Sequence, residues 1–137
     1  MTYPDGGVRT SVSDLSRFFA ALLDGGQYRG ARILAPELAA EMLRFQYAGA
    51  AIPDNVDPAK VNSGIFWSTK LETTLVGHGG SDPGLETVML YDPKAGVGLI
   101  LFTNTAPDET GMKAYIAMVQ LLRERGLQLK AQTRTVR

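Results

Sequence analysis

The second half of the chain alternates strand-like segments with very short turns, and this pattern restricts the fold more than any other feature. Four segments rich in β-branched and aromatic residues are expected as strands: 63–71, 75–78, 85–92 and 97–104. Short polar or glycine-rich stretches separate them: 72–74, 79–84 and 93–96. Because connections this short join antiparallel neighbours, the sequence predicts an antiparallel sheet of about four strands.

Two further segments with helical periodicity bracket these strands. Residues 13–24 place five apolar side chains on one face: Leu15, Phe18, Phe19, Leu22 and Leu23. Ser13 is the expected N-cap, and Gly25–Gly26 is the expected stop. A long helix is expected over 108–125, where Gly126 would end it and leave 126–137 as a frayed polar tail.

A third helix is expected over 36–46. Pro36 suits its first turn, and Leu38, Met42 and Phe45 form a narrow apolar stripe. Residues 48–62 have two prolines and no period, which indicates a long loop. The order of elements predicts an α+β fold in which helices pack on the antiparallel sheet.

Composition excludes several function classes. The 137 residues fit one domain, 1–137, and the 14 basic and 14 acidic residues balance to zero net charge. That balance favours neither nucleic acid nor an anionic membrane as a partner. No apolar run reaches the roughly 18 residues of a membrane span. The chain has no cysteine. Its first ten residues contain no apolar run, so no signal peptide is expected in this sequence, and the compartment stays open.

A nucleophilic serine needs a base at a fixed position, and the chain lacks the usual arrangements. No serine is followed three residues later by lysine, and Gly-x-Ser-x-Gly is absent. Ser68 and Lys70 are expected to share a strand face as a surface pair. His78, Asp82 and Glu86 are spaced by four, but the intervening glycines and proline forbid a helix. We therefore expect no metal site and no cofactor, and the glycines fail the dinucleotide fingerprint.

The segment "VGHGGSDPG", residues 76–84, contains the only histidine, His78. One interpretation is a loop histidine beside a tight turn. The other is functional: glycines after a strand let a substrate lie close to the strand edge, where free backbone N–H groups bind an oxyanion. The residues alone leave both open.

Several segments together resemble the serine β-lactamase and penicillin-binding-protein family, of the class C β-lactamase, esterase and D-peptidase type. "YPDGGVRTSVSDLSRFFAALLDGG" is similar to its "GG-L-x-S-T-x-x-D-L-x-R-F" helix, and "RILAPELAAEML" to the next helix. "VGHGGSDPG", "YDPKAGVGLILFTN" and the final helix follow in the family's order, to about residue 125. The resemblance implies a partial β-lactamase/transpeptidase-like fold that lacks the N-terminal elements.

The same resemblance implies one of the family's three catalytic elements. His78, Gly79 and Gly80 look like its Lys-Thr-Gly or His-x-Gly strand, and Ser81 would offer the backbone N–H of an oxyanion hole. The other two elements are missing, because the chain has neither Ser-x-x-Lys nor Tyr-x-Asn. Family members hydrolyse esters or amides through an acyl-serine, often in the periplasm or outside the cell.

We therefore expect the C-terminal part of a serine acyl-hydrolase that is inert alone and that an N-terminal part of the same fold would complement. A β-lactam, ester or peptide substrate is expected only after such complementation. Uncovered apolar surface would favour self-association as a dimer or swapped oligomer. Two alternatives remain: a non-catalytic binding or regulatory module using the groove beside His78, and a structural remnant.

Overall fold

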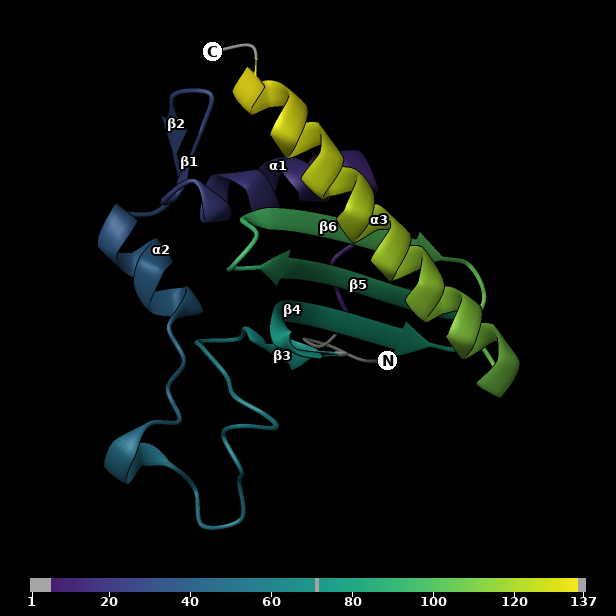
Figure 1. The fold of residues 1–137 in the computed structure, drawn as a ribbon, viewed down its shortest axis with the longest axis horizontal. Helices are drawn as coiled ribbons and strands as arrows, with labels where there is room; N and C mark the ends of the chain where they lie inside the picture. The colour runs from purple at the N-terminus through teal and green to yellow at the C-terminus, as the bar shows by residue number, and fades with distance from the viewer. Residues whose placement is uncertain (1–5, 71, 136–137) are drawn as a thin grey trace.

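The computed structural model describes residues 6–70 and 72–135 and has the α+β architecture expected from the sequence (Figure 1). Its helices are α1 (Val12–Leu23), α2 (Pro36–Leu43) and α3 (Glu109–Thr135), with a short 3-10 turn at Gly49–Ala51. The main sheet has the order β3 (Ser68–Lys70), β4 (Glu72–Asp82), β5 (Leu85–Asp92) and β6 (Val97–Thr103). All neighbours in it are antiparallel, as predicted. A separate small hairpin pairs β1 (Gln27–Tyr28) with β2 (Ala31–Arg32).

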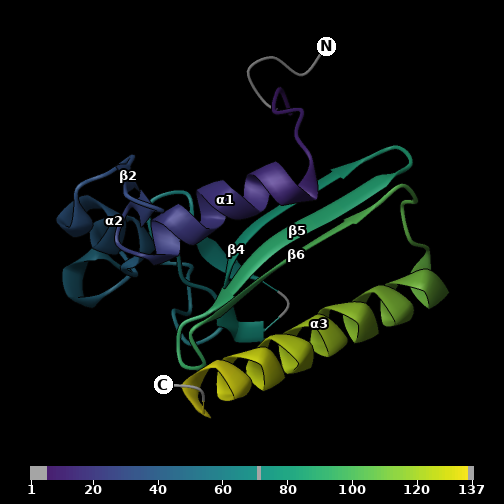
Figure 2. The same ribbon diagram turned by 90° about the horizontal axis from the view of Figure 1, so that it is seen from above.

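The sheet lies between α1 on one face and α3 on the other (Figure 2). Because strand side chains alternate between faces, each face has its own buried cluster. The α1 face buries Phe19, Leu22, Ala39, Trp67, Val76 and Met89. The α3 face buries Leu75, Val88, Leu90, Leu99, Tyr115 and Val119. The neighbours Leu75 and Val76 therefore serve different cores.

Helix α1 begins slightly earlier than the sequence indicated. Ser11, not Ser13, is the N-cap: its Oγ accepts a hydrogen bond from the backbone N–H of Asp14 at 3.0 Å. The expected stop at Gly25–Gly26 is confirmed, since both residues have positive φ angles of 61° and 81°.

Helix α2 is shorter than the expected 36–46 and buries a different residue. It ends at Leu43 because Arg44 adopts an extended backbone. Ala39 is its buried residue, whereas Leu38 is 55% exposed, so the predicted apolar stripe was partly wrong. Pro36 occupies the first turn as expected.

The first predicted strand and the turn after it were wrong in detail. Of the expected strand at 63–71, only Ser68–Lys70 pairs as β3. The residues before it form a tight turn, in which the N–H of Gly64 donates to the carbonyl of Trp67 at 2.7 Å. Residues 72–74, expected as a turn, belong to β4. Leu71 lies outside the described residues.

Helix α3 continues to Thr135, so the expected stop at Gly126 and the tail after it are replaced by helix. Gly126 serves close packing instead: a Cβ there would lie 2.4 Å from Cγ1 of Val97. One turn later, Nζ of Lys130 donates to the carbonyl of Ala95 at 2.5 Å. The last turns of α3 are therefore attached to the β5–β6 turn. No helix in the described ranges is both long and apolar enough to cross a bilayer.

An ion pair between a buried carboxylate and a part-exposed arginine joins the same turn to the middle of α3. Asp92, only 2% exposed, accepts a 2.8 Å hydrogen bond from Nε of Arg123 and a second bond from Nη2. Its other oxygen accepts from the N–H of Ala95 at 2.9 Å. Burial alone would raise the pKa of Asp92, but the bonds from Ala95 and Arg123 hold that pKa below its ordinary value. The ionised carboxylate therefore stabilises the fold.

This lowered pKa predicts acid sensitivity with a definite sign. The stabilisation is complete above the unfolded-state pKa of about 3.9 and is lost as pH falls through the lower folded-state value. We expect Asp92→Asn to reduce the free energy of unfolding at neutral pH by about 2 kcal/mol. The variant should also lose less stability than the parent chain between about pH 5 and pH 2.

Urea unfolding at a series of pH values measures both effects. The matched control is Asp54→Asn, which removes the same charge from an exposed loop position. Parallel acid profiles for the parent and Asp92→Asn would contradict the stabilising role of the ionised Asp92.

Candidate functional site

The glycine-rich segment is a strand rather than the loop that its composition indicated. β4 runs through His78, Gly79, Gly80, Ser81 and Asp82, and each of these residues has a partner on β5. The loop expected over 79–84 shrinks to the two-residue turn after Asp82. Pairing with β5 outweighs the low strand propensity of glycine, because strand formation depends strongly on tertiary context.

The two edges of β4 differ along its length. On one edge the ladder with β5 continues to the pair Asp82–Leu85. On the other edge the ladder with β3 begins at the pair Ser68–Gly77. Among the described strands, none pairs with this second edge from His78 to Asp82. Backbone groups on that edge are therefore available to a ligand, as at other sheet edges.

The glycines of this strand have different structural roles. A Cβ on Gly77 would lie 1.9 Å from the carbonyl oxygen of Met89, so backbone packing against β5 requires glycine there. A Cβ on Gly79 would first meet the carbonyl of Thr87 at 3.5 Å, an ordinary contact. A Cβ on Gly80 would meet only Oγ1 of Thr87, at 2.9 Å. Sequence reasoning missed the role of Gly77, because nothing in the sequence separates it from the other glycines.

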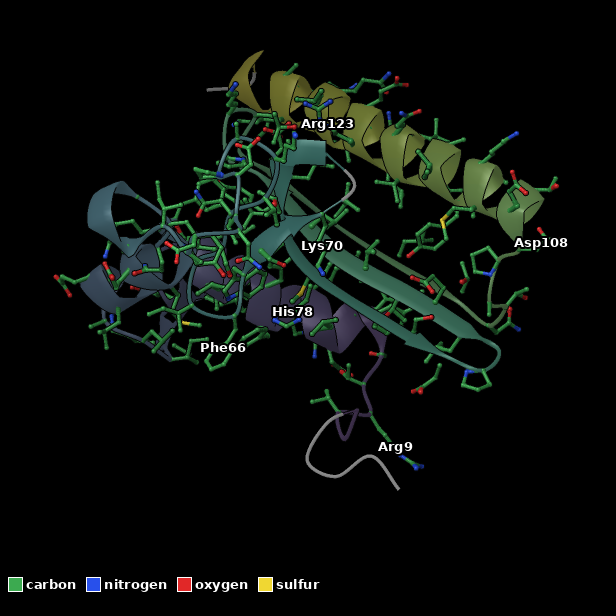
Figure 3. The ribbon with its side chains drawn as sticks, turned by 90° about the horizontal axis from the view of Figure 1, so that it is seen from below. Arg9, Phe66, Lys70, His78, Asp108 and Arg123 are labelled. Carbon is green, nitrogen blue, oxygen red and sulfur yellow. The ribbon has the colours of Figure 1, made fainter. Side chains whose placement is uncertain are left out.

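His78 lies at the end of a row of aromatic rings. Phe19 of α1 stacks on Trp67 with ring centroids 5.7 Å apart, and Trp67 meets the imidazole edge-on at 5.8 Å. Trp67 is buried, whereas His78 is exposed. The row fixes one side of the imidazole against the core and leaves the rest facing solvent. Figure 3 labels His78 on the α1 side of the sheet.

A cavity of about 560 Å³ extends from His78 along β4. Its floor is the sheet and its far wall is the segment that precedes α1. The lining residues are Gly6, Val8, Arg9, Thr10, Leu15, His78, Gly79, Gly80, Ser81, Asp82, Leu85, Thr87, Val88, Met89 and Phe102. The structure thus brings all four sequence-predicted site residues, 78–81, to one cavity. Its volume lies in the range typical of small-molecule sites.

The described residues do not place a nucleophile–base pair at this cavity. The hydroxyl of Ser11 bonds to Asp14, and those of Ser16 and Ser63 bond to backbone carbonyls. In the part of the chain that the structure describes, no serine hydroxyl bonds to a lysine or to His78. Nor do any three His, Asp or Glu side chains there form a group able to hold a metal ion.

Comparison with models of known protein families shows which family the chain belongs to. The Beta-lactamase family profile matches residues 1–123, most of the chain. The chain belongs to the beta-lactamase family. No curated protein matches it. In this beta-lactamase-family chain, the three α-helices and the four-strand antiparallel sheet fit a partial β-lactamase-like fold.

The different surroundings of Gly77 and Gly79 give a test, because the same substitution to alanine should change the free energy of unfolding by different amounts at the two positions. Gly77→Ala forces a methyl group into the backbone of β5 and should reduce the free energy of unfolding by about 3 kcal/mol. Gly79→Ala meets ordinary contacts and should change it by no more than about 0.5 kcal/mol. Chemical denaturation of the two variants compares them directly. Equal losses would show that the close approach at Gly77 is not what selects glycine there.

Proposed function

We propose that this chain forms the substrate-binding strand of a serine acyl-hydrolase site, with the backbone of residues 78–81 facing the scissile ester or amide. The observation that carries the proposal is the open edge of β4. It begins at His78, where the β3 ladder has ended, and it borders a cavity of about 560 Å³. Membership of the beta-lactamase family supports a hydrolase of the serine type.

The role proposed for the strand is electrostatic and steric. In acyl transfer, negative charge develops on the carbonyl oxygen, and backbone N–H groups fixed in advance stabilise it. Ser81 is proposed to supply one such N–H, by the resemblance of His78-Gly79-Gly80 to the family's strand motif. Gly80 supports this role because strand alternation places it on the same face as His78, and its missing side chain leaves that face accessible beside the cavity.

We propose that the chain has no turnover by itself. The covalent step requires a hydroxyl oxygen to attack the carbonyl carbon while a base takes its proton. The sequence has no Ser-x-x-Lys or Tyr-x-Asn, and in the described residues no serine hydroxyl bonds to a lysine or to His78. Loss of one member of a catalytic group already removes most of the rate. A complementing part of the same fold would have to bring both groups to the cavity.

The cavity also supports a second candidate function, a binding or regulatory module without chemistry. Both candidate functions use the β4 edge. They differ in whether adding the missing part of the fold produces turnover. A hydrolase component gains turnover when the missing catalytic elements are supplied, whereas a binding module does not. Gly80→Val, which projects a branched side chain toward Thr87, should weaken ligand binding in both.

The test of inertness uses a chromogenic β-lactam and a p-nitrophenyl ester. We expect neither substrate to be hydrolysed faster than in buffer, and intact mass spectrometry should show no acyl adduct. An adduct that maps to any serine of the chain would refute the claim that it lacks a nucleophile. Ser81→Ala then serves as the control, because a proposed backbone donor keeps its N–H in that variant.

We further propose that the chain self-associates along β6 and α3. Among the described strands, β6 pairs only with β5. Near the end of β6, the hydroxyl of Tyr115 is buried and has no hydrogen-bond partner in the described residues. Burial, and after it the charge of Glu86, raises the pKa of Tyr115 to about 12. That hydroxyl remains a donor at neutral pH. Helix α3 also exposes apolar side chains: Ile116, Met118, Leu121 and Leu122.

Light scattering coupled to size exclusion tests this association. We expect a dimer or larger species, shifted toward monomer by Leu121→Lys, because Leu121 is 65% exposed on α3. Leu38→Lys is the matched control, since Leu38 is 55% exposed on α2, away from the proposed contact. A parent chain that stays monomeric at high concentration would contradict the proposal.

A further inference from the structure

A tight turn directly before β3 has an unusual residue at its tip. Ser63 and Ser68 face each other as an isolated bridge, and the N–H of Gly64 donates to the carbonyl of Trp67 at 2.7 Å. Ile65 and Phe66 therefore occupy the tip. Phe66 has a φ of 67°, in the left-handed region that turns normally fill with glycine or asparagine.

Packing inside the chain does not account for this phenylalanine. Its side chain is 77% exposed, so the ring contributes little to either core. A bulky residue with positive φ is a backbone outlier, and such outliers gather at functional sites. The strain and the exposed ring therefore have no explanation in the packing of the described residues.

The turn is held firmly in place. The N–H of Ile65 donates to the carbonyl of Met42 at 2.9 Å, which joins the turn to the end of α2. A Cβ on Gly64 would lie 2.3 Å from that same carbonyl, so the backbones are in close contact. Phe66 is therefore presented by a fixed backbone, which lowers the entropy cost of using its ring in binding.

The turn lies where the open edge of β4 begins. It ends the ladder between β3 and β4 at the pair Ser68–Gly77, one residue before His78. Trp67, the next residue after Phe66, contacts the imidazole of His78. Figure 3 shows Phe66 and His78 labelled on the same side of the sheet, the side of α1. A ligand lying along β4 from Asp82 past His78 would next meet this turn.

We propose that Phe66 is a specificity-determining residue that contacts an apolar group of an ester or amide ligand lying along the β4 edge. The inference rests on the proposed function and adds the chemistry of the preferred ligand: an aromatic or bulky aliphatic substituent beyond the carbonyl. Contact between the Phe66 ring and such a substituent gains both apolar burial and aromatic packing.

Two matched probes test the proposal without requiring turnover: phenylacetylglycine methyl ester and acetylglycine methyl ester. They differ only in the phenyl group, and titration of the ¹⁵N-labelled chain reports binding at the amides of Gly79, Gly80 and Ser81. We expect the phenylacetyl probe to bind more tightly to the parent chain. Phe66→Gly should weaken that probe about fivefold and leave the acetyl probe unchanged.

The controls separate this inference from the site itself. Phe18→Leu removes another part-exposed aromatic ring, from a helical position on α1, and should keep the preference for the phenylacetyl probe. Phe66→Gly should melt at the same temperature as the parent or higher, because glycine relieves the backbone strain. A large fall in its melting temperature would make the ring structural and overturn the inference.

Two further outcomes are decisive. If both probes shift the β4 amides but Phe66→Gly keeps the preference, the β4 site stands and the role of Phe66 is refuted. If neither probe shifts those amides in the parent chain, the proposed function fails, and the inference fails with it.

Discussion

The antiparallel ladder between β4 and β5 is the interaction on which the rest of this structure depends. It holds a glycine-rich segment extended from Val76 to Asp82, although glycine has little tendency to form strands by itself. The ladder requires the backbones to approach so closely at Gly77 that a side chain there would collide with Met89. Because β5 pairs with one edge throughout and β3 stops early, no described strand pairs with the other edge from His78 to Asp82.

On the face of the sheet that α3 covers, contacts between α3 and the β5–β6 turn stabilise the structure. Asp92 joins the β5–β6 turn to Arg123, and close packing at Gly126 together with Lys130 extends this attachment along α3. These contacts lie on the α3 side, whereas the cavity beside His78 lies on the α1 side. The arrangement separates the residues that hold the sheet in shape from those proposed to meet a ligand.

Strand and helix positions could be predicted where pattern and turn chemistry agree. The segments 85–92 and 97–104 alternate or run apolar between short turns, and they fold as β5 and β6 with little change. Gly25–Gly26 ends α1 as its sequence indicates, since both glycines adopt positive φ. In these cases the local sequence and the tertiary fold favour the same conformation.

The remaining features depend on contacts that no local pattern encodes. Gly126 resembles a helix stop, but its missing side chain admits Val97 and the helix continues. Residues 63–67 have strand-like composition, yet their hydrogen bonds to Met42 and within the turn bend them away from β4. The site residues 78–81 were identified through resemblance, whereas the unpaired edge beside them follows from where β3 stops pairing.

The row of rings from Phe19 through Trp67 to His78 has an optical consequence. Trp67 is the chain's one tryptophan, and it is buried between the core and the candidate site. An indole is a fluorophore whose emission depends on its immediate surroundings. The chain therefore carries an intrinsic fluorophore in contact with His78, a residue that lines the cavity, so a ligand that displaces the imidazole is expected to change the indole emission.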